Sequence, residues 1–231
     1  MSNTKNYLII GGNSGIGESL KEKLNENNHT VLVASRNGKG SPQSILFDAT
    51  KDELNLDDLP PALNGLVYCP GTITLKPFHR ISDSEYLEDF QINVLGAIRC
   101  IRKVLPLLKN SDQASIVMFS TVAVQQGMPF HASVASAKGA IEGLVRSLAA
   151  EFAPKIRVNA IAPSLTDTPL AAKLLSSEEK RKASNERHPL KRLGQSNDIA
   201  NLASFLLSEE SSWITGQVIH ADGGLSTLRV G

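Results

Sequence analysis

The stretch Tyr7-Leu-Ile-Ile-Gly-Gly-Asn-Ser-Gly-Ile-Gly-Glu-Ser-Leu20 decides the fold, because an apolar run enters a glycine-rich turn that opens directly into a helical pattern. Such a turn can hold a phosphate with backbone N–H groups at the positive end of the helix. We expect Gly12 to allow the tight turn, Gly15 to let the backbone approach a pyrophosphate, and Gly17 to permit close packing of helix on strand. The stretch therefore predicts a dinucleotide site. The other residues of the predicted binding turn are Asn13, Ser14 and Ile16.

Short β-rich apolar runs alternate with longer segments of helical periodicity along the whole chain. The expected strands are 7–10, 30–34, 44–47, 66–69, 115–120, 157–162 and 217–220, and the expected helices are 15–27, 83–108, 132–152 and 198–207. This alternation is typical of a parallel sheet covered by helices on both faces. The segment around Pro60 and Pro61 leaves room for only a turn or two of helix. We therefore predict an α/β fold, a single domain over residues 1–231 with a doubly wound, Rossmann-type, seven-stranded parallel sheet.

The composition favours a small molecule as the partner. The 231 residues fit one domain, the net charge is +1, and the lysines and arginines are dispersed, so neither nucleic acid nor an anionic membrane is expected. The two cysteines, Cys69 and Cys100, form neither a disulfide framework nor a metal-binding pattern, and no metal is expected. No apolar run approaches membrane-spanning length, and the residues before the first strand leave no room for a signal peptide. These features predict a soluble cytoplasmic protein.

The end of the second predicted strand, Ala34-Ser35-Arg36, indicates which dinucleotide binds. An acidic residue here would bind the 2′-hydroxyl of NAD, whereas an arginine can bind the 2′-phosphate of NADP. No Asp or Glu occurs in residues 30–43. The planar guanidinium of Arg36 suits bidentate contact with a phosphate, with Ser35 as a further donor and Lys39 nearby. The expected cofactor is therefore NADP(H); the alternative is that Arg36 is a solvated loop arginine.

Further motifs follow the glycine turn along the chain. They are Asp48-Ala49, Gln91-Ile-Asn-Val-Leu-Gly96, Lys138, Pro163-Ser-Leu-Thr-Asp-Thr168, Arg192-Leu-Gly194, Asp198-Ile-Ala200, Ile214-Thr-Gly216 and Asp222-Gly-Gly224. With these motifs the chain resembles the short-chain dehydrogenase/reductase family from Tyr7 to Gly224. The resemblance implies that Asn93 holds a proton-relay water and that the protein forms a homodimer or homotetramer. The further positions that it implies as cofactor contacts are Asp48, Ala49, Cys69, Pro70, Gly71, Lys138, Pro163, Leu165 and Thr168.

The main departure from the family lies at the catalytic residues. The family signature is Tyr-x-x-x-Lys with a serine thirteen residues before the tyrosine; here Lys138 is present, Val134 stands at the tyrosine position and Thr121 at the serine position. Hydride delivery to a carbonyl leaves an alkoxide, which a phenol with its pKa lowered by the adjacent lysine can protonate. Valine has no proton to give. Thr121 keeps a hydroxyl that can polarise a carbonyl, and Ser120 beside it is the competing candidate.

Two further departures lie near the same cofactor. Asn-Asn-Ala-Gly, expected after the fourth strand, is replaced by Tyr68-Cys-Pro-Gly71, and the glycine after Pro163 is Ser164. Together with the valine, they indicate a natively altered site. The candidate proton donors are His131, three residues before the valine, and a water held by Lys138 and Asn93. Tyr68 is expected on the adenosine side, too far away.

Three functions remain open from these residues. They are an NADP(H)-dependent oxidoreductase that acts on an unidentified carbonyl or alcohol with an atypical proton donor, a non-catalytic NADP(H)-binding sensor or structural subunit, and a non-redox lyase or isomerase. Residues 169–178 resemble the family's lid helix over the nicotinamide. Leu170, Leu174 and Leu175 in this segment weakly favour an apolar or mixed substrate, unless they pack onto the sheet instead.

Overall fold

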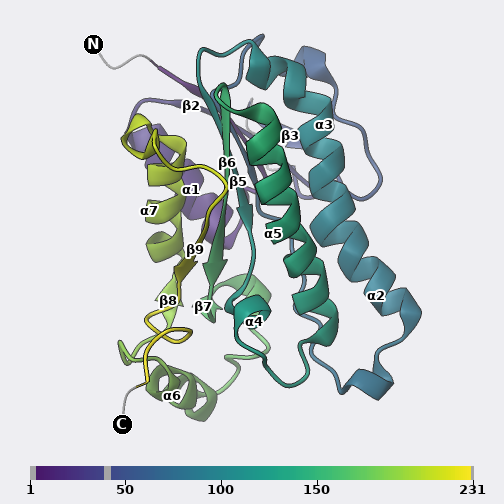
Figure 1. Ribbon diagram of the computed structural model, residues 1–231, viewed down its shortest axis with the longest axis vertical. Coiled ribbons are helices and arrows are strands. Elements are labelled where there is room, and N and C mark those ends of the chain that lie inside the picture. The colour runs from purple at the N-terminus through teal and green to yellow at the C-terminus, as the bar shows by residue number, and fades with distance from the viewer. Residues whose placement is uncertain (1–3, 39–42, 230–231) are drawn as a thin grey trace.

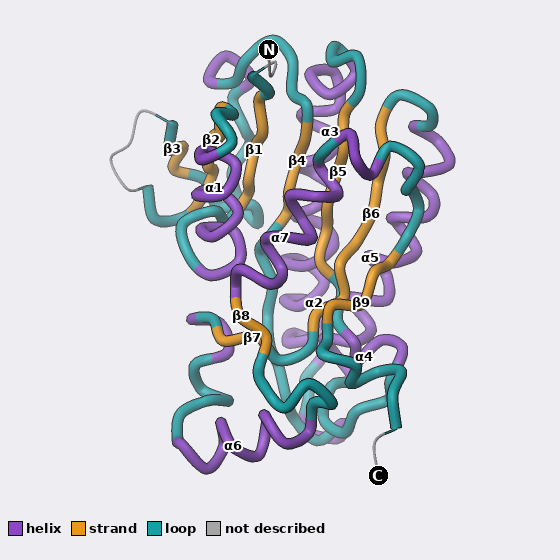
Figure 2. The backbone as a smooth tube through the Cα atoms, turned by 90° about the vertical axis from the view of Figure 1, so that its left-hand side faces the viewer, coloured by secondary structure: helices purple, strands orange, loops and turns teal. Residues whose placement is uncertain are grey.

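A seven-stranded parallel sheet forms the centre of the molecule (Figure 1), and its strands follow the order β3-β2-β1-β4-β5-β6-β9 (Figure 2). The computed structural model describes residues 4–38 and 43–229. The strands are β1 (Asn6–Ile10), β2 (Thr30–Ser35), β3 (Ser44–Leu46), β4 (Gly65–Tyr68), β5 (Ala114–Phe119), β6 (Ile156–Pro163) and β9 (Val218–Ala221). The predicted fold is confirmed, and every predicted strand end lies within one residue of the observed one. Because the chain order reverses between β1 and β4, a crevice opens at the carboxyl ends of these two strands.

Helices cover both faces of the sheet and enclose one core on each (Figures 1 and 2). On one face lie α1 (Gly15–Glu26) and α7 (Ser196–Leu207), and on the other lie α2 (Asp83–Phe90), α3 (Gly96–Lys109) and α5 (Ala132–Phe152). Helices α4 (Val122–Gln125) and α6 (Glu178–Arg187) and a small sheet of β7 (Thr166–Asp167) and β8 (Gly194–Gln195) lie beyond the carboxyl ends of the main strands. These additions therefore surround the crevice. Within the described residues, no helix is long and apolar enough to cross a membrane.

The segment predicted as a lid helix, 169–178, is mostly not helical. A 3₁₀ turn covers Pro169–Ala171, and the helix α6 begins only at Glu178. Leu175 is buried in a small cluster with Ala171 and Leu193, away from the main sheet. That separate packing holds the segment in turns, so the predicted helix is wrong here. Between β3 and β4, in contrast, the expected single turn of helix is present at Leu56–Asp58.

The helix predicted over 83–108 is interrupted by a π-helical turn, Gln91–Leu95, between α2 and α3. The Gly96 N–H donates to the carbonyl of Gln91, five residues back, which releases the carbonyl of Ile92. The Tyr68 hydroxyl donates to that Ile92 oxygen at 2.5 Å. A side chain that enters the backbone ladder in this way is a known cause of local helix widening. Tyr68 of β4 thus shapes the turn that carries Asn93.

Replacing Gly96 with Ala should destabilise the protein, because a Cβ at residue 96 would lie 2.2 Å from the Tyr68 hydroxyl oxygen. We expect a loss of about 1–3 kcal/mol in the free energy of unfolding. In a Tyr68→Phe background the clashing oxygen is gone, so the same substitution should cost less. Urea unfolding of the four variants of this double-mutant cycle measures the difference. An equal cost in both backgrounds would show that the hydroxyl does not set the spacing.

Candidate functional site

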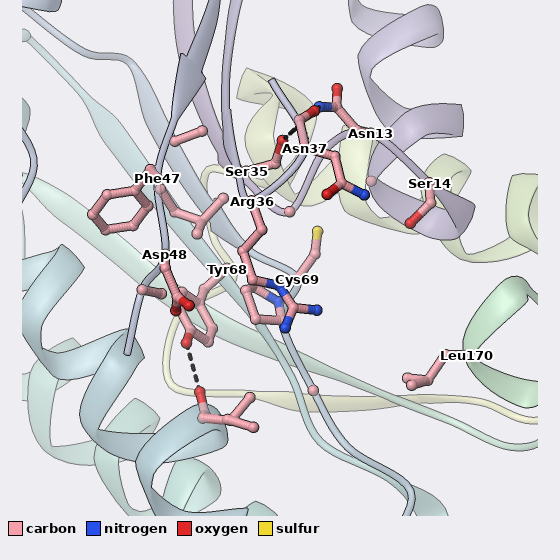
Figure 3. Close-up of a pocket in the computed structure, with 18 of the residues that line it drawn as sticks. Asn13, Ser14, Ser35, Arg36, Asn37, Phe47, Asp48, Tyr68, Cys69 and Leu170 are labelled. Atoms are coloured by element: carbon pink, nitrogen blue, oxygen red, sulfur yellow. Dashed lines mark hydrogen bonds between the residues drawn. The ribbon is translucent and has the colours of Figure 1, made fainter. Parts of the chain in front are cut away.

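Two adjoining cavities open at the carboxyl ends of the strands and form one cleft. The first, about 540 Å³, is lined by the glycine turn and the ends of β2, β3 and β4, and we call it the glycine-turn cavity (Figure 3). The second, about 470 Å³, contains Lys138, and we call it the lysine cavity. The residues that line both are Ile16, Cys69, Gly71, Thr168 and Leu170. A single extended ligand can therefore occupy both.

The glycine turn has the geometry that a phosphate requires. Gly11 and Gly15 have φ angles of +80° and +55°, which favour glycine. A Cβ at Gly17 would lie 2.5 Å from the Gly11 carbonyl oxygen, so the predicted close packing at Gly17 is present. Ser14, the N-cap of α1, makes no side-chain hydrogen bond to the first turn, and that turn keeps its backbone N–H groups for a ligand. Asn13, Ser14, Gly15, Ile16 and Gly17 all line the glycine-turn cavity.

Gly12 has a different role from the predicted one. It is buried and does not line either cavity, and a Cβ there would lie 2.9 Å from both methyl carbons of Val33 on β2. The left-handed conformation that the tight turn needs belongs to Gly11 instead. Gly12 therefore serves the contact between the turn and the neighbouring strand.

The end of β2 places Arg36 at the rim of the glycine-turn cavity, where its side chain extends between Asp48 and Cys69 (Figure 3). Arg36 is exposed, whereas Ser35 is buried and accepts a hydrogen bond from the Asn13 amide. Asn13 also donates to the backbone oxygen of Asn37 at 2.6 Å. The Ser35 hydroxyl is thus engaged within the protein, and Asn13 ties the glycine turn to the end of β2. Lys39 lies outside the described residues.

The end of β3 supplies the opposite wall. The Asp48 carboxylate accepts hydrogen bonds from the Thr50 hydroxyl at 2.7 Å and the Thr50 N–H at 2.9 Å, which lower the pKa of Asp48. Ala49 beside it is buried, and its carbonyl oxygen accepts from Arg99 at 3.0 Å. Asp48, Ala49, Cys69, Pro70 and Gly71 all line this cavity, as expected of cofactor contacts. Burial raises the pKa of the Cys69 thiol to about 12, so this thiol is neutral.

Lys138 lies on α5, one turn after Val134, and both side chains are buried against the lysine cavity. Burial lowers the pKa of Lys138 to about 8, and the opposing influence of Cys69 and Asp89 offsets only part of this shift. Within the described part of the chain, the ammonium group has no hydrogen-bond acceptor. A cation whose donors are not used inside the protein can bind the hydroxyls of a ligand.

Asn93, in the π-helical turn, lies close to the Lys138 ammonium group. Its amide nitrogen donates to the Thr72 hydroxyl and to the Asp89 carbonyl, each at 2.8 Å. Its amide oxygen is buried and has no partner among the described residues. A Cβ at Gly71 would lie 3.4 Å from both this oxygen and the Lys138 Nζ, so Gly71 keeps the space between them open. The structure therefore brings Asn93 and Lys138 together, as the motifs predict.

The two candidate hydroxyls at the end of β5 differ in their hydrogen bonds. Ser120 donates to the Glu142 carboxylate at 2.7 Å. Thr121, the N-cap of α4, accepts from the Ala123 N–H at 3.3 Å, and no described residue accepts its proton. Thr121 is therefore the hydroxyl that is free to donate into the cavity. His131 also lines this cavity, and its Nδ1 lies 2.7 Å from the Pro129 carbonyl oxygen.

The remaining predicted contacts come from the end of β6. Pro163 and Leu165 line the lysine cavity, and Thr168 lines both cavities. Leu170 lies at the junction of the two, and Leu174 lines the lysine cavity. These leucines give the cleft an apolar margin, and the apolar or mixed substrate stays a prediction.

Sequence analysis missed a buried polar cluster around Asp89. This carboxylate is 1% exposed and accepts hydrogen bonds from the hydroxyls of Thr72 at 2.6 Å, Thr74 at 3.0 Å and Ser133. Through Thr72 it joins the amide of Asn93. The sequence contained one signal of this cluster. Asp89 lies one helical turn before Asn93, on the same side of the predicted helix as its buried apolar residues, where a charged residue needs polar partners.

Known proteins resemble this chain over nearly its whole length. A family model described as enoyl-(acyl carrier protein) reductase matches residues 10–226. A tropinone reductase homolog of Arabidopsis thaliana is 34% identical over an alignment that covers 96% of this chain and 92% of the relative. The 3-oxoacyl-(acyl-carrier-protein) reductase FabG of Staphylococcus aureus is 29% identical, with coverage of 97% and 99%. The solved structure of ElxO with NADP bound has a TM-score of 0.88 at 27% identity, with coverage of 98% and 100%.

Proposed function

The chain belongs to the short-chain dehydrogenase/reductase family, and we propose that it is an NADP(H)-dependent oxidoreductase of a small carbonyl compound or alcohol. One observation carries this proposal. A single cleft connects the glycine turn and Arg36 to a chamber that contains Lys138 and a free Thr121 hydroxyl. The relatives named as reductases support the reaction class.

The residues of the cleft fit a dinucleotide. The first turn of α1 and the glycines before it leave backbone N–H groups for a pyrophosphate, where the helix dipole favours an anion. At the adenosine end, residues 35–37 are Ser, Arg and Asn, so the end of β2 carries no carboxylate that would repel a 2′-phosphate. Arg36 would bind that phosphate, which favours NADP(H) over NAD(H). When bound, the nicotinamide supplies or accepts the hydride.

The lysine cavity would orient the substrate and the nicotinamide ribose. We propose that the Lys138 ammonium binds the ribose hydroxyls and that the Thr121 hydroxyl donates to the substrate oxygen. Val134, at the position of the family's tyrosine, presents only methyl groups to the cavity. The proton that completes carbonyl reduction must then come from another group, such as His131 or a water held between Asn93 and Lys138. The proton donor is in this sense atypical.

Fluorescence titration with NADPH and with NADH tests the cofactor. We expect Arg36→Ala to weaken NADPH binding about 10- to 100-fold, because a charge-assisted contact with phosphate contributes roughly 1.5–3 kcal/mol, and to leave NADH binding unchanged. Arg102→Ala, an exposed arginine of α3 away from both cavities, is the matched control. NADH binding as tight as NADPH binding would contradict the choice of cofactor. Binding of neither would contradict the whole proposal.

Turnover is tested next with NADPH and a panel of ethyl acetoacetate, 2,3-butanedione and 4-nitrobenzaldehyde. Oxidation of NADPH by the wild-type protein supports the proposal. Tight NADPH binding without turnover, followed by a gain of turnover in Val134→Tyr, would favour the alternative of a non-catalytic NADP(H)-binding subunit. Conversion of a probe with no change in the redox state of the NADPH would favour a lyase or isomerase. The homodimer or homotetramer stays a prediction.

A further inference from the structure

Ser164 and His188 form a hydrogen-bonded pair at the edge of the lysine cavity. Ser164 follows Pro163 at the end of β6 and lines the cavity, and its hydroxyl oxygen lies 2.8 Å from His188 Nε2. His188 comes directly after α6 and is 2% exposed. The pair therefore joins a residue of the cavity wall to a buried imidazole. Residues 24 positions apart meet here because α6 folds back over the end of the sheet.

The other ring nitrogen settles the tautomer. His188 Nδ1 lies 2.7 Å from the Ser184 carbonyl oxygen, which can only accept, so Nδ1 carries a proton in both charge states of the ring. Nε2 then accepts the Ser164 proton when the ring is neutral and donates to Ser164 when the ring is charged. The nearest other acceptor for the Ser164 hydroxyl is the Asp222 carbonyl oxygen, at 3.4 Å. The Ser164 hydroxyl thus connects a residue of the cavity wall to an ionisable side chain.

The other hydroxyls of this cavity have different partners. Ser120 donates to the Glu142 carboxylate, and an ionised carboxylate only accepts, whereas an imidazole ring can both accept and donate at Nε2. No ionisable side chain of the described structure is bonded to the Thr121 hydroxyl. The two departures from the family pattern are also complementary. Residue 134 lacks a proton where the family has a phenol, and residue 164 has a hydroxyl where the family has glycine.

We infer that Ser164 and His188 form a proton relay for the lysine cavity, with Ser164 as the group that exchanges the proton with the substrate oxygen; this inference rests on the proposed oxidoreductase function. In reduction, a bound NADPH would supply the hydride to the carbonyl carbon, and the carbonyl oxygen accepts the Ser164 hydroxyl proton. Ser164 Oγ then accepts the Nε2 proton of the His188 imidazolium. His188 is left neutral with its proton on Nδ1, and solvent in the open cavity returns the Nε2 proton by the same path. Alcohol oxidation reverses each transfer.

Single-turnover and steady-state reduction of the most active probe of the panel tests the relay. Ser164→Ala removes the exchanging hydroxyl, and His188→Gln keeps an N–H at the Nε2 position while removing the ionisable ring. We expect each variant to lose about 10²- to 10⁴-fold in kcat. The double variant should lose no more than either alone, because the pair acts as one unit. The NADPH dissociation constant should change less than twofold in all three.

A merely structural pair behaves differently. If the contact only ties α6 to β6, His188→Gln retains it and kcat stays near the wild-type value, which would overturn the relay. Ser136→Ala, on the exposed side of α5, is the matched control for a serine substitution. Wild-type turnover that survives in Ser164→Ala overturns the relay alone. NADPH binding without any turnover by the wild-type protein overturns both the relay and the proposed function.

Discussion

Replacing Lys138 with Met is expected to lower kcat for carbonyl reduction by about 10²-fold, because the cofactor loses a positioning contact, and at the same time to make the protein more stable at pH 7. The loss of activity follows because the ammonium group has no acceptor among the described residues and is placed to bind the cofactor ribose. The gain in stability follows because the methionine removes a buried charge and keeps similar volume. Opposite changes in activity and stability would mark Lys138 as a residue kept for function.

The stability difference should depend on pH in a defined direction. The native pKa of Lys138 is about 8 and the usual value is 10.5, so burying the charged form costs about 3 kcal/mol below pH 8. Between pH 8 and 10.5 the unfolded chain holds the proton that the native protein has released, and wild-type stability therefore rises with pH in this window. The advantage of Lys138→Met should accordingly be largest at pH 7 and narrow above pH 8.

Urea unfolding of wild type and Lys138→Met at pH 7, 8, 9 and 10 measures this difference, and the paired comparison cancels other groups that titrate in the same range. Lys173→Met, an exposed lysine outside both cavities, is the control and should change neither kcat nor stability much. A Lys138→Met variant with wild-type kcat would contradict the proposed role. A variant less stable than wild type at pH 7 would show that the ammonium group is held by stronger contacts than the structure contains.

Replacing Gly17 with Ala should weaken NADPH binding strongly and destabilise the fold. The new Cβ would lie 2.5 Å from the Gly11 carbonyl oxygen and 2.9 Å from the Gly12 Cα. Both are backbone atoms, so the clash cannot be relieved by a side-chain rotation, and α1 must move away from β1. We expect a loss of about 1–3 kcal/mol in unfolding free energy and at least a 100-fold weaker NADPH affinity. Urea unfolding and fluorescence titration measure the two effects.

Gly143→Ala is the matched control for that substitution. Gly143 is an exposed residue in the middle of α5, and nothing lies within 4 Å of a Cβ built there. The same added methyl should stabilise the protein by about 1 kcal/mol, because alanine favours the helix over glycine. Full NADPH binding by Gly17→Ala would contradict the assignment of the glycine turn as the pyrophosphate site.

Local patterns in the sequence were enough to predict the sheet and the outline of the cleft. The inner strands β1, β4, β5 and β6 are buried on both faces and therefore read as nearly continuous apolar runs between turns. The ends of all seven strands agree with the prediction within one residue. The glycine turn combines a strand, a turn and a helix start in one short segment. The roles of Lys138 and Asn93 were implied by the resemblance to the family, whose motifs contain a lysine and an asparagine at these positions.

The tertiary structure alone decided how the side chains of the site are connected. Tyr68 inserts from β4 into a helix that the periodicity predicts as continuous, Glu142 takes the proton of Ser120, and Gly11 takes the turn conformation expected of Gly12. The link between Ser164 and His188 likewise joins the sheet to a helix predicted at the wrong position. Hydrophobic periodicity indicates which face of a helix or strand is buried, and this was enough to predict the layers of sheet and helices. Hydrogen bonds between elements depend on how each helix is rotated and placed on the sheet, which only the packed fold determines.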